Sequence, residues 1–172
     1  MKTVFFDVDT QLDFVSPGGA LYVPGAELVI PAVAALNRRA EVLVSTVDAH
    51  CEDDIEFKVW KPHCVVGCLG QRKPAETVVG GKQFVFEKVT TDAFLSPRME
   101  PLLRELAADR FVVYGVVTEI CVRFAAMGLL ATGARVEIVT DAVRQLSDAN
   151  MEEFYADFRS RRGVLTTSRA LL

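Results

Sequence analysis

The chain has 172 residues, of which 51% are hydrophobic, and it carries a formal net charge of −4. This length predicts one domain over residues 1–172, and the hydrophobic content excludes an intrinsically disordered chain. The acidic balance, without a basic cluster, argues against a nucleic-acid partner, and no apolar run is long enough to cross a membrane. The opening run MKTVFFDVDT lacks the pattern of a signal peptide, and the four cysteines are then expected to be free thiols of a cytoplasmic protein.

Apolar runs rich in β-branched and aromatic residues alternate along the chain with segments of helical periodicity. Because proline is tolerated only near a helix start, Pro31 predicts that the first helix becomes regular a few residues after Ala26. The expected strands are Lys2–Phe6, Glu41–Ser45, Gln83–Glu87, Phe111–Tyr114, Arg135–Val139 and Val164–Thr166. The expected helices are Ala26–Arg39, Met99–Ala108, a helix after Gly115 that carries Cys121, and a helix from Ser147 to about Arg161.

This alternation predicts an α/β fold. We expect a doubly wound, mostly parallel sheet of six strands with helices on both faces, as in Rossmann-like proteins. Ligands of such sheets bind at the carboxyl ends of the strands, so polar residues that follow the strands are expected to share one rim. These residues are Asp9, Asp48, His50, Lys88, Cys121 and Asp141.

Cys121 is the candidate nucleophile. It follows the strand Phe111–Tyr114 and Gly115, in the first turn of the next expected helix, where Thr118 or Glu119 can act as the N-cap. The positive end of the helix dipole favours a thiolate there and is expected to lower the pKa of the thiol. The alternative interpretation is a small buried hydrophobic residue.

The loop at about residues 47–81 is the candidate metal and substrate loop. It is long and polar, and it contains both histidines of the chain, His50 and His63. Loops of this length within compact domains are usually functional or disordered. Together with Asp48, the histidines indicate metal ligation, with a solvated pair as the alternative. A thiolate-rich zinc site is a second alternative, which would use Cys51, Cys64 and Cys68 with a histidine.

The first strand allows two interpretations. FFDVDT resembles the opening motif of haloacid-dehalogenase-like phosphatases, in which Asp7 would be the nucleophile, Asp9 the general acid, and both would hold magnesium. Against this interpretation, Gln11 stands where that motif has threonine, and Asp141 matches only part of the last acidic motif of those phosphatases. It also leaves Cys121 without a role.

The second interpretation uses three motifs that occur in order along most of the chain. In these motifs the sequence resembles the isochorismatase-like cysteine hydrolases, and within them the nicotinamidases (pyrazinamidases). The motifs are Asp9-x-Gln11-x-Asp13-Phe14 after the first strand, Lys88 after the third, and Gly115-x-x-Thr118-x-x-Cys121-Val122 after the fourth.

The metal loop carries the same resemblance. Asp48-x-His50 is similar to the Asp-x-His pair of nicotinamidases, and the segment from Trp60 to Gly67, WKPHCVVG, is similar to their Trp-Pro-Pro-His-Cys-Val-x-Gly segment. Many members have a further histidine between these two points, which this chain lacks, and Glu56 stands where some members have an acidic ligand. The resemblance implies one divalent ion, zinc, iron or manganese, held by Asp48, His50, Glu56 and His63.

The activity implied by the resemblance is hydrolysis of nicotinamide, and of similar aromatic carboxamides such as pyrazinamide, to the acid and ammonia, a reaction of NAD salvage. Cys121 would attack the carbonyl to give a thioester, Asp9 would transfer the protons, and Lys88 would keep both groups ionised. The N–H groups of Val117 and Cys121 would form the oxyanion hole, and the peptide between Val116 and Val117 would be cis.

The same resemblance places Phe14 and Trp60 around the aromatic ring of the substrate and the metal at its ring nitrogen, with Asp13 as a positioning residue. The expected partners are a small carboxamide and, by analogy, further copies of the chain in a homo-oligomer. Two alternatives stay open: another isochorismatase-like amidase with a different substrate, and a non-enzymatic binding protein in which Cys121 is buried.

Overall fold

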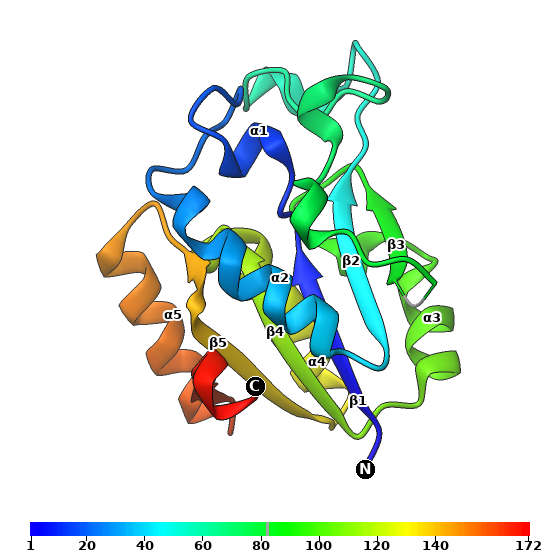
Figure 1. Ribbon diagram of the computed structural model, residues 1–172, viewed down its shortest axis with the longest axis vertical. Coiled ribbons are helices and arrows are strands. Elements are labelled where there is room, and N and C mark those ends of the chain that lie inside the picture. The colour runs from blue at the N-terminus through cyan, green and yellow to red at the C-terminus, as the bar shows by residue number, and fades with distance from the viewer. Residues whose placement is uncertain (82) are drawn as a thin grey trace.

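The computed structural model describes residues 1–81 and 83–172. Within them, six parallel strands form one sheet in the order β3-β2-β1-β4-β5-β6 (Figure 1). The strands are β1 (Thr3–Val8), β2 (Leu43–Asp48), β3 (Gln83–Lys88), β4 (Arg110–Val116), β5 (Arg135–Arg144) and β6 (Val164–Thr166). The α-helices are α1 (Leu12–Val15), α2 (Ile30–Arg39), α3 (Met99–Leu106), α4 (Arg123–Ala131) and α5 (Asp148–Ser160). The predicted doubly wound α/β fold is confirmed.

Short helical turns complete the described secondary structure. One of them, η6 (Thr118–Val122), is a π-helical turn between β4 and α4. The others are the 3₁₀ turns η1 (Ala26–Val29), η2 (Ile55–Lys58), η3 (Leu69–Gln71), η4 (Ala75–Thr77), η5 (Ala93–Leu95) and η7 (Ser168–Ala170).

Helices cover both faces of the sheet. In Figure 1, α2 lies in front of the sheet and α4 lies behind it. α2 packs against β1 and β5 through a face that includes the buried Val33 and Leu36, and α4 packs against β4 and β5 with Ala126 and Leu129 buried. Because both faces are covered, β1 and β4 are buried along nearly their whole length instead of alternating between buried and exposed residues.

A proline accounts for where α2 begins, and strand pairing accounts for where β2 ends. The first helix is a 3₁₀ turn from Ala26 and becomes an α-helix at Ile30, with Pro31 in its first turn, as predicted. β2 begins two residues later than predicted and continues to Asp48, because its last residue still pairs with Lys88 of β3. Asp48 therefore stands at the end of a strand and not in the loop beyond it.

The prediction that Asp141 shares the rim is wrong. After an irregularity in the pairing of β4 with β5, pairing resumes at Gly115 and Val143, so β5 extends past Asp141. The Asp141 carboxylate accepts hydrogen bonds from the backbone N–H and the hydroxyl of Ser168, at 2.7 and 2.6 Å. This exposed side chain ties the C-terminal turn to β5.

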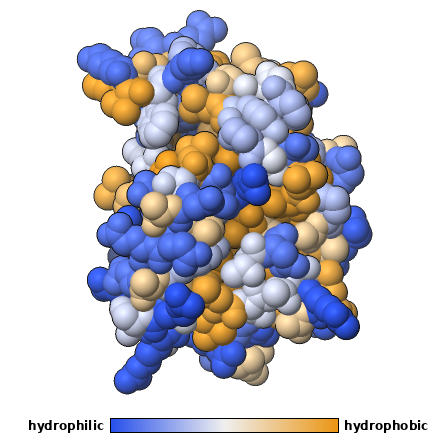
Figure 2. All heavy atoms as spheres, turned by 90° about the vertical axis from the view of Figure 1, so that its left-hand side faces the viewer, coloured by the Kyte–Doolittle hydropathy of each residue, from blue (hydrophilic) through white to orange (hydrophobic). Residues whose placement is uncertain are grey.

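The surface gives less information than the interior. None of the described helices is long and apolar enough to cross a membrane. Figure 2 shows the side of the molecule that lies to the left in Figure 1, where several hydrophobic patches are bordered by hydrophilic residues. Scattered apolar side chains are normal on protein surfaces, so the homo-oligomer stays a prediction.

The carboxyl ends of β1, β2 and β3 lie at one end of the sheet, below α1 and the first part of the loop that follows β2 (Figure 1). The strand order reverses between β1 and β4, because the chain adds β2 and β3 on one side of β1 and then β4, β5 and β6 on the other. Doubly wound sheets bind their ligands at such a switch point. The residues that follow these strands therefore define the candidate site.

We predict that Gly115→Ala unfolds the protein or lowers its free energy of unfolding by more than about 3 kcal/mol. Gly115 has a φ of +119°, and an added Cβ would overlap the carbonyl oxygen of Val8 on the neighbouring strand. Gly133→Ala is the matched control, since φ is +85° there but no atom lies within 4 Å of the added Cβ. The control should lose only about 1–2 kcal/mol in chemical denaturation, and equal losses for the two variants would contradict the argument.

Candidate active site

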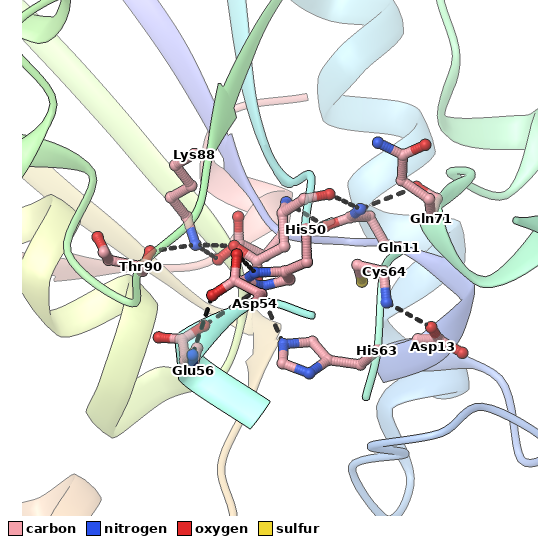
Figure 3. Close-up of polar contacts among 12 residues, drawn as sticks. Gln11, Asp13, His50, Asp54, Glu56, His63, Cys64, Gln71, Lys88 and Thr90 are labelled. Carbon is pink, nitrogen blue, oxygen red and sulfur yellow. Dashed lines mark hydrogen bonds and ion pairs between the residues drawn. The ribbon is translucent and has the colours of Figure 1, made fainter. Parts of the chain in front are cut away.

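The buried ammonium of Lys88, at the end of β3, lies between two carboxylates (Figure 3). Its Nζ lies 2.8 Å from Asp9 Oδ2 and 2.5 Å from Asp48 Oδ1, and it donates to the carbonyl oxygen of Thr90 at 3.0 Å. These three acceptors match the three protons of an ammonium group. The charged side chains at the ends of β1, β2 and β3 were predicted to share one rim of the sheet, and they contact one another directly.

The backbone of Asp9 leaves the strand in the left-handed region, with a φ of 50°. Aspartate tolerates this conformation better than most residues. The turn carries the Asp9 carboxylate over the end of the sheet, where Oδ1 accepts a hydrogen bond from the Thr46 hydroxyl at 2.7 Å and Oδ2 faces Lys88. One oxygen is therefore held from β2 and the other from β3.

The electrostatics of the three groups are coupled. Burial lowers the pKa of Lys88, but the charges of Asp9, Cys121 and Asp48 outweigh burial and raise it well above its ordinary value. Burial raises the pKa of Asp48, but the charge of Lys88 and the two nearby histidines outweigh it, so that this pKa lies below its usual range. For Asp9, burial prevails over Lys88 and the pKa is raised. Asp48 is thus held in its ionised form, whereas the Asp9 carboxylate binds a proton more readily.

Cys121 faces this cluster as a buried thiol. Burial raises the pKa of Cys121 well above its ordinary value, against the lowering effect of Lys88, and the charges of Asp9 and Asp48 raise it further. The predicted lowering of this pKa is wrong, because burial and the two carboxylates outweigh Lys88, and Cys121 lies in the π-helical turn before α4 and not in the first turn of an α-helix. Asp9 is near enough to influence the thiol, and its carboxylate is therefore the candidate acceptor of the thiol proton.

The turn that presents Cys121 differs from the predicted helix start. β4 is followed by a cis peptide between Val116 and Val117, which agrees with the resemblance, and then by η6. The predicted cap is wrong, since Val117 occupies the N-cap position and no side chain caps the turn. Glu119 bonds elsewhere, to the backbone before α5.

Asp48, His50 and His63 form a group whose ligand atoms lie within 4.8 Å of one another. His50 Nδ1 lies 3.0 Å from Asp54 Oδ2, and His63 Nδ1 lies 2.7 Å from the carbonyl oxygen of Lys61. Hydrogen bonds from the Glu56 backbone N–H and from His50 hold the pKa of Asp54 below its usual range, so Asp54 is an acceptor. Both histidines therefore donate from Nδ1, which leaves Nε2 as the ligand atom.

The two Nε2 atoms face one carboxylate oxygen. They lie 3.8 Å and 3.6 Å from Asp48 Oδ2, and the buried Nε2 of His50 has no hydrogen-bond partner among the described residues. Three electron-pair donors that converge in this way fit a divalent cation with mixed nitrogen and oxygen ligation. The residues present thus fit the metal that the resemblance implies.

Glu56 lies at the edge of this group. Its Oε2 is 3.3 Å from His50 Nε2, but it is not one of the three residues whose ligand atoms are mutually close. Its role as a fourth ligand stays a prediction. The thiolate-rich alternative is contradicted in the described part of the chain, because none of Cys51, Cys64 and Cys68 belongs to the group.

Two side chains of the segment after β1 hold the metal loop. Gln11 donates from Nε2 to the carbonyl oxygens of Asp48 and Gln71, each at 2.8 Å, and accepts from Asp48 N–H at 2.7 Å. Asp13 accepts from Cys64 N–H at 2.7 Å, directly after His63 (Figure 3). Asp13 thus contacts the backbone of the metal loop, as expected of a positioning residue. Local sequence patterns gave no sign of the Gln11 bonds or of Asp54, since both depend on contacts across the fold.

Asp7, the nucleophile of the phosphatase interpretation, is fully buried and engaged. It pairs with Lys73 at 2.9 Å and accepts hydrogen bonds from Thr10 and Asn37 at 2.7 and 2.8 Å. A carboxylate held in this way has no free oxygen for attack on a phosphate. Its charge instead ties the end of the metal loop to the sheet.

A cavity of about 260 Å³ opens onto Cys121, Asp48 and His63. Its other walls are mostly aromatic and aliphatic, and Phe14 and Trp60, the two predicted pocket residues, both line it. The ring of Phe14 lies 5.4 Å from that of His63. The candidate nucleophile, the candidate metal group and a mostly apolar cavity thus share one space, which suits a small flat molecule with one polar group.

Comparisons with known proteins agree with this geometry. The nicotinamidase of Acinetobacter baylyi is 23% identical over 81% of this chain and 79% of that protein. The structure of the pyrazinamidase of Pyrococcus horikoshii in complex with zinc is similar with a TM-score of 0.89 and 28% identity, over 97% of this chain and 99% of that one. The N-carbamoylsarcosine amidase of Thermoplasma acidophilum is similar with a TM-score of 0.84 and 27% identity, over 98% and 97% of the two chains.

The Isochorismatase domain family matches residues 3–170, nearly the whole chain. This match overturns the phosphatase alternative. The protein is therefore a member of the isochorismatase-like hydrolase family.

Proposed function

We propose that this protein hydrolyses nicotinamide and similar aromatic carboxamides to the acid and ammonia, with Cys121 as the nucleophile. The observation that carries the proposal is the Lys88 ammonium, which bridges Asp9 and the metal-group residue Asp48 beside a ring-sized cavity. The relatives named nicotinamidase and pyrazinamidase support this choice of substrate. The reaction would belong to NAD salvage in the cytoplasm, and the protein would act as a single domain with its metal and substrate loop at residues 47–81.

Asp9 acts as the general base and acid. As Cys121 Sγ forms a bond to the amide carbon, the thiol proton moves to Asp9 and the carbonyl electron pair moves to oxygen. The C–N bond then breaks, and the nitrogen takes the proton from Asp9 and leaves as ammonia. Water adds to the thioester while Asp9 accepts its proton, and the sulfur leaves with that proton, which restores the thiol.

Lys88 and the backbone stabilise the charges that appear during these steps. The Lys88 ammonium favours a charged Asp9 and a charged sulfur, because an opposite charge at this distance stabilises the ionised form. The N–H groups of Val117 and Cys121 donate to the oxyanion of the tetrahedral intermediate.

Asp48, His50 and His63, with Glu56 beside them, would hold one divalent ion, which is zinc, iron or manganese. When bound, the ion supplies a Lewis-acidic position for the ring nitrogen of the substrate. Phe14 and Trp60 enclose the ring, and Asp54 and the Lys61 carbonyl keep the two histidines in the ligating tautomer.

A second candidate is another amidase reaction at the same centre. The similarity to N-carbamoylsarcosine amidase favours it, because that protein shares the fold at an identity close to that of the pyrazinamidase. The chemistry of Cys121, Asp9 and Lys88 would be unchanged, and only the substrate would differ. Ammonia release from N-carbamoylsarcosine but not from nicotinamide would favour this candidate.

We predict that the purified, metal-loaded protein releases ammonia from nicotinamide and that Cys121→Ala lowers kcat by at least about a thousandfold, because no other group can form the thioester. Cys68→Ala is the control, since Cys68 is exposed and does not line the cavity. The control should keep wild-type turnover. Ammonia release that survives in Cys121→Ala would end the covalent mechanism.

The pH dependence of kcat/KM should report Asp9. Asp9 must be ionised to accept a proton, and burial raises its pKa against the lowering effect of Lys88. Activity is therefore lost as the pH falls through this raised pKa, above the range in which an exposed aspartate titrates. Lys88→Met removes the lowering effect and should move the acid limb to higher pH, whereas Lys88→Arg keeps the charge and should move it less. An acid limb at the same pH in all three proteins would speak against Asp9 as the base.

Metal affinity should depend on Asp54. Asp54→Ala removes the acceptor at His50 Nδ1, and the loss of such a partner should weaken binding by about 10–100-fold. Glu52→Ala removes an exposed acid from the same loop and serves as the control for charge. Zinc affinity would be measured by competition with a chromogenic chelator. Equal affinities for the two variants would show that Asp54 does not orient His50.

A further inference from the structure

Glu119 connects two segments of the candidate site that lie far apart in the sequence. It belongs to η6, the turn that carries Cys121. Its Oε1 accepts hydrogen bonds from the backbone N–H groups of Leu146 at 2.9 Å and Ser147 at 2.7 Å. These two residues form the end of the connection between β5 and α5. One carboxylate therefore joins the nucleophile turn to the start of α5.

The connection reaches the wall of the cavity. Leu146 lines the same cavity as Ile120 and Cys121, the two residues that follow Glu119. The side chain of Leu146 is 53% exposed, so packing alone fixes it poorly. The bond from its N–H to Glu119 gives this part of the wall a fixed position relative to the sulfur.

The bonding pattern of Glu119 differs from that of a local cap. A capping side chain bonds to N–H groups of its own turn, and no side chain does so in η6. The second oxygen, Oε2, is buried without a hydrogen-bond partner among the described residues. A buried carboxylate oxygen without a hydrogen-bond partner costs free energy. The two hydrogen bonds that Oε1 accepts offset this cost, so they are what the side chain contributes.

We propose that Glu119 is a positioning residue, which holds the Leu146 wall and the Cys121 turn in one fixed arrangement around the ring of the substrate. This inference rests on the proposed carboxamide hydrolysis. Glu119 touches no reacting atom and acts through Leu146 on substrate binding, and through η6 on the direction from which the sulfur meets the carbonyl.

The test compares Glu119→Met with Glu119→Gln. Methionine has a similar length but a much weaker acceptor, whereas glutamine keeps an oxygen that can accept from Leu146 and Ser147. We expect Glu119→Met to lower kcat/KM for nicotinamide by at least about tenfold, mainly through a higher KM, because two charge-assisted bonds are lost. Glu119→Gln should stay within about threefold of wild type, since one neutral acceptor replaces a charged one.

Ser147→Ala is the matched control for stability. It removes the bond from Asn150 N–H to the Ser147 hydroxyl at the start of α5 but keeps the N–H that Glu119 binds. It should lower the thermal midpoint and leave KM unchanged. An equal rise of KM in Ser147→Ala, or equal kinetics for the Met and Gln variants, would overturn the proposal.

Leu146→Ala tests the route of the effect. If Glu119 acts on binding through Leu146, the double variant Glu119→Met/Leu146→Ala should have a KM close to that of Leu146→Ala alone, because the second change removes nothing further. Fully additive effects on KM would overturn this route.

A substrate-independent measurement separates this inference from the proposed function. The rate of Cys121 alkylation by iodoacetamide, followed by peptide mapping, should change by more than about threefold in Glu119→Met and stay near the wild-type rate in Glu119→Gln and Ser147→Ala. If the wild type hydrolyses no carboxamide, the proposed function fails and the alkylation rates still decide the role of Glu119. Equal rates in all four proteins would overturn it.

Discussion

The site depends on one buried ammonium group between two carboxylates. Lys88 is the last residue of β3, and its Nζ contacts both Asp9 and Asp48, which stand at the ends of β1 and β2. Without a cation between them, two buried carboxylates would repel each other and at least one would take up a proton. The parallel sheet supplies this arrangement directly, since adjacent strands end side by side. The candidate proton-transfer group and the candidate metal group are thus joined by a single side chain.

The segment that follows β1 likewise contacts two parts of the site. Asp9 belongs to the proton-transfer cluster, while Gln11 and Asp13, two and four residues later, bond to the backbone of the metal loop at Asp48 and Cys64. The metal loop has little regular structure of its own, so side chains from elsewhere must satisfy its backbone groups. In the proposed mechanism, this short stretch of sequence therefore positions both the base and the residues that would hold the metal.

The sequence allowed the prediction of the sheet and of most residues at its rim, because strand ends follow from apolar runs and the carboxyl ends of parallel strands meet. Asp141 was misplaced, since an irregularity in the pairing of β4 and β5, which no local pattern reveals, lengthens β5. Asp54 and Glu119 were not recognised as supporting residues, because each bonds to a partner brought near by the loop or the fold rather than by a motif. Local rules predict elements well, but they do not predict the side chains that join them.

The pKa of Cys121 shows where a local rule was outweighed. A helix start favours a thiolate, but the side chain is buried beside two carboxylates, and burial raises the pKa despite Lys88. The resting site then holds a neutral thiol next to a carboxylate, with the ammonium beyond it. A neutral, buried thiol reacts slowly with oxidants and alkylating agents, which attack thiolates. Negative charge would reach the sulfur only as it bonds to a carbonyl carbon, while Asp9 takes the proton. In the proposed mechanism, burial and base catalysis would therefore be two parts of one arrangement, which would protect the sulfur until a substrate occupies the cavity.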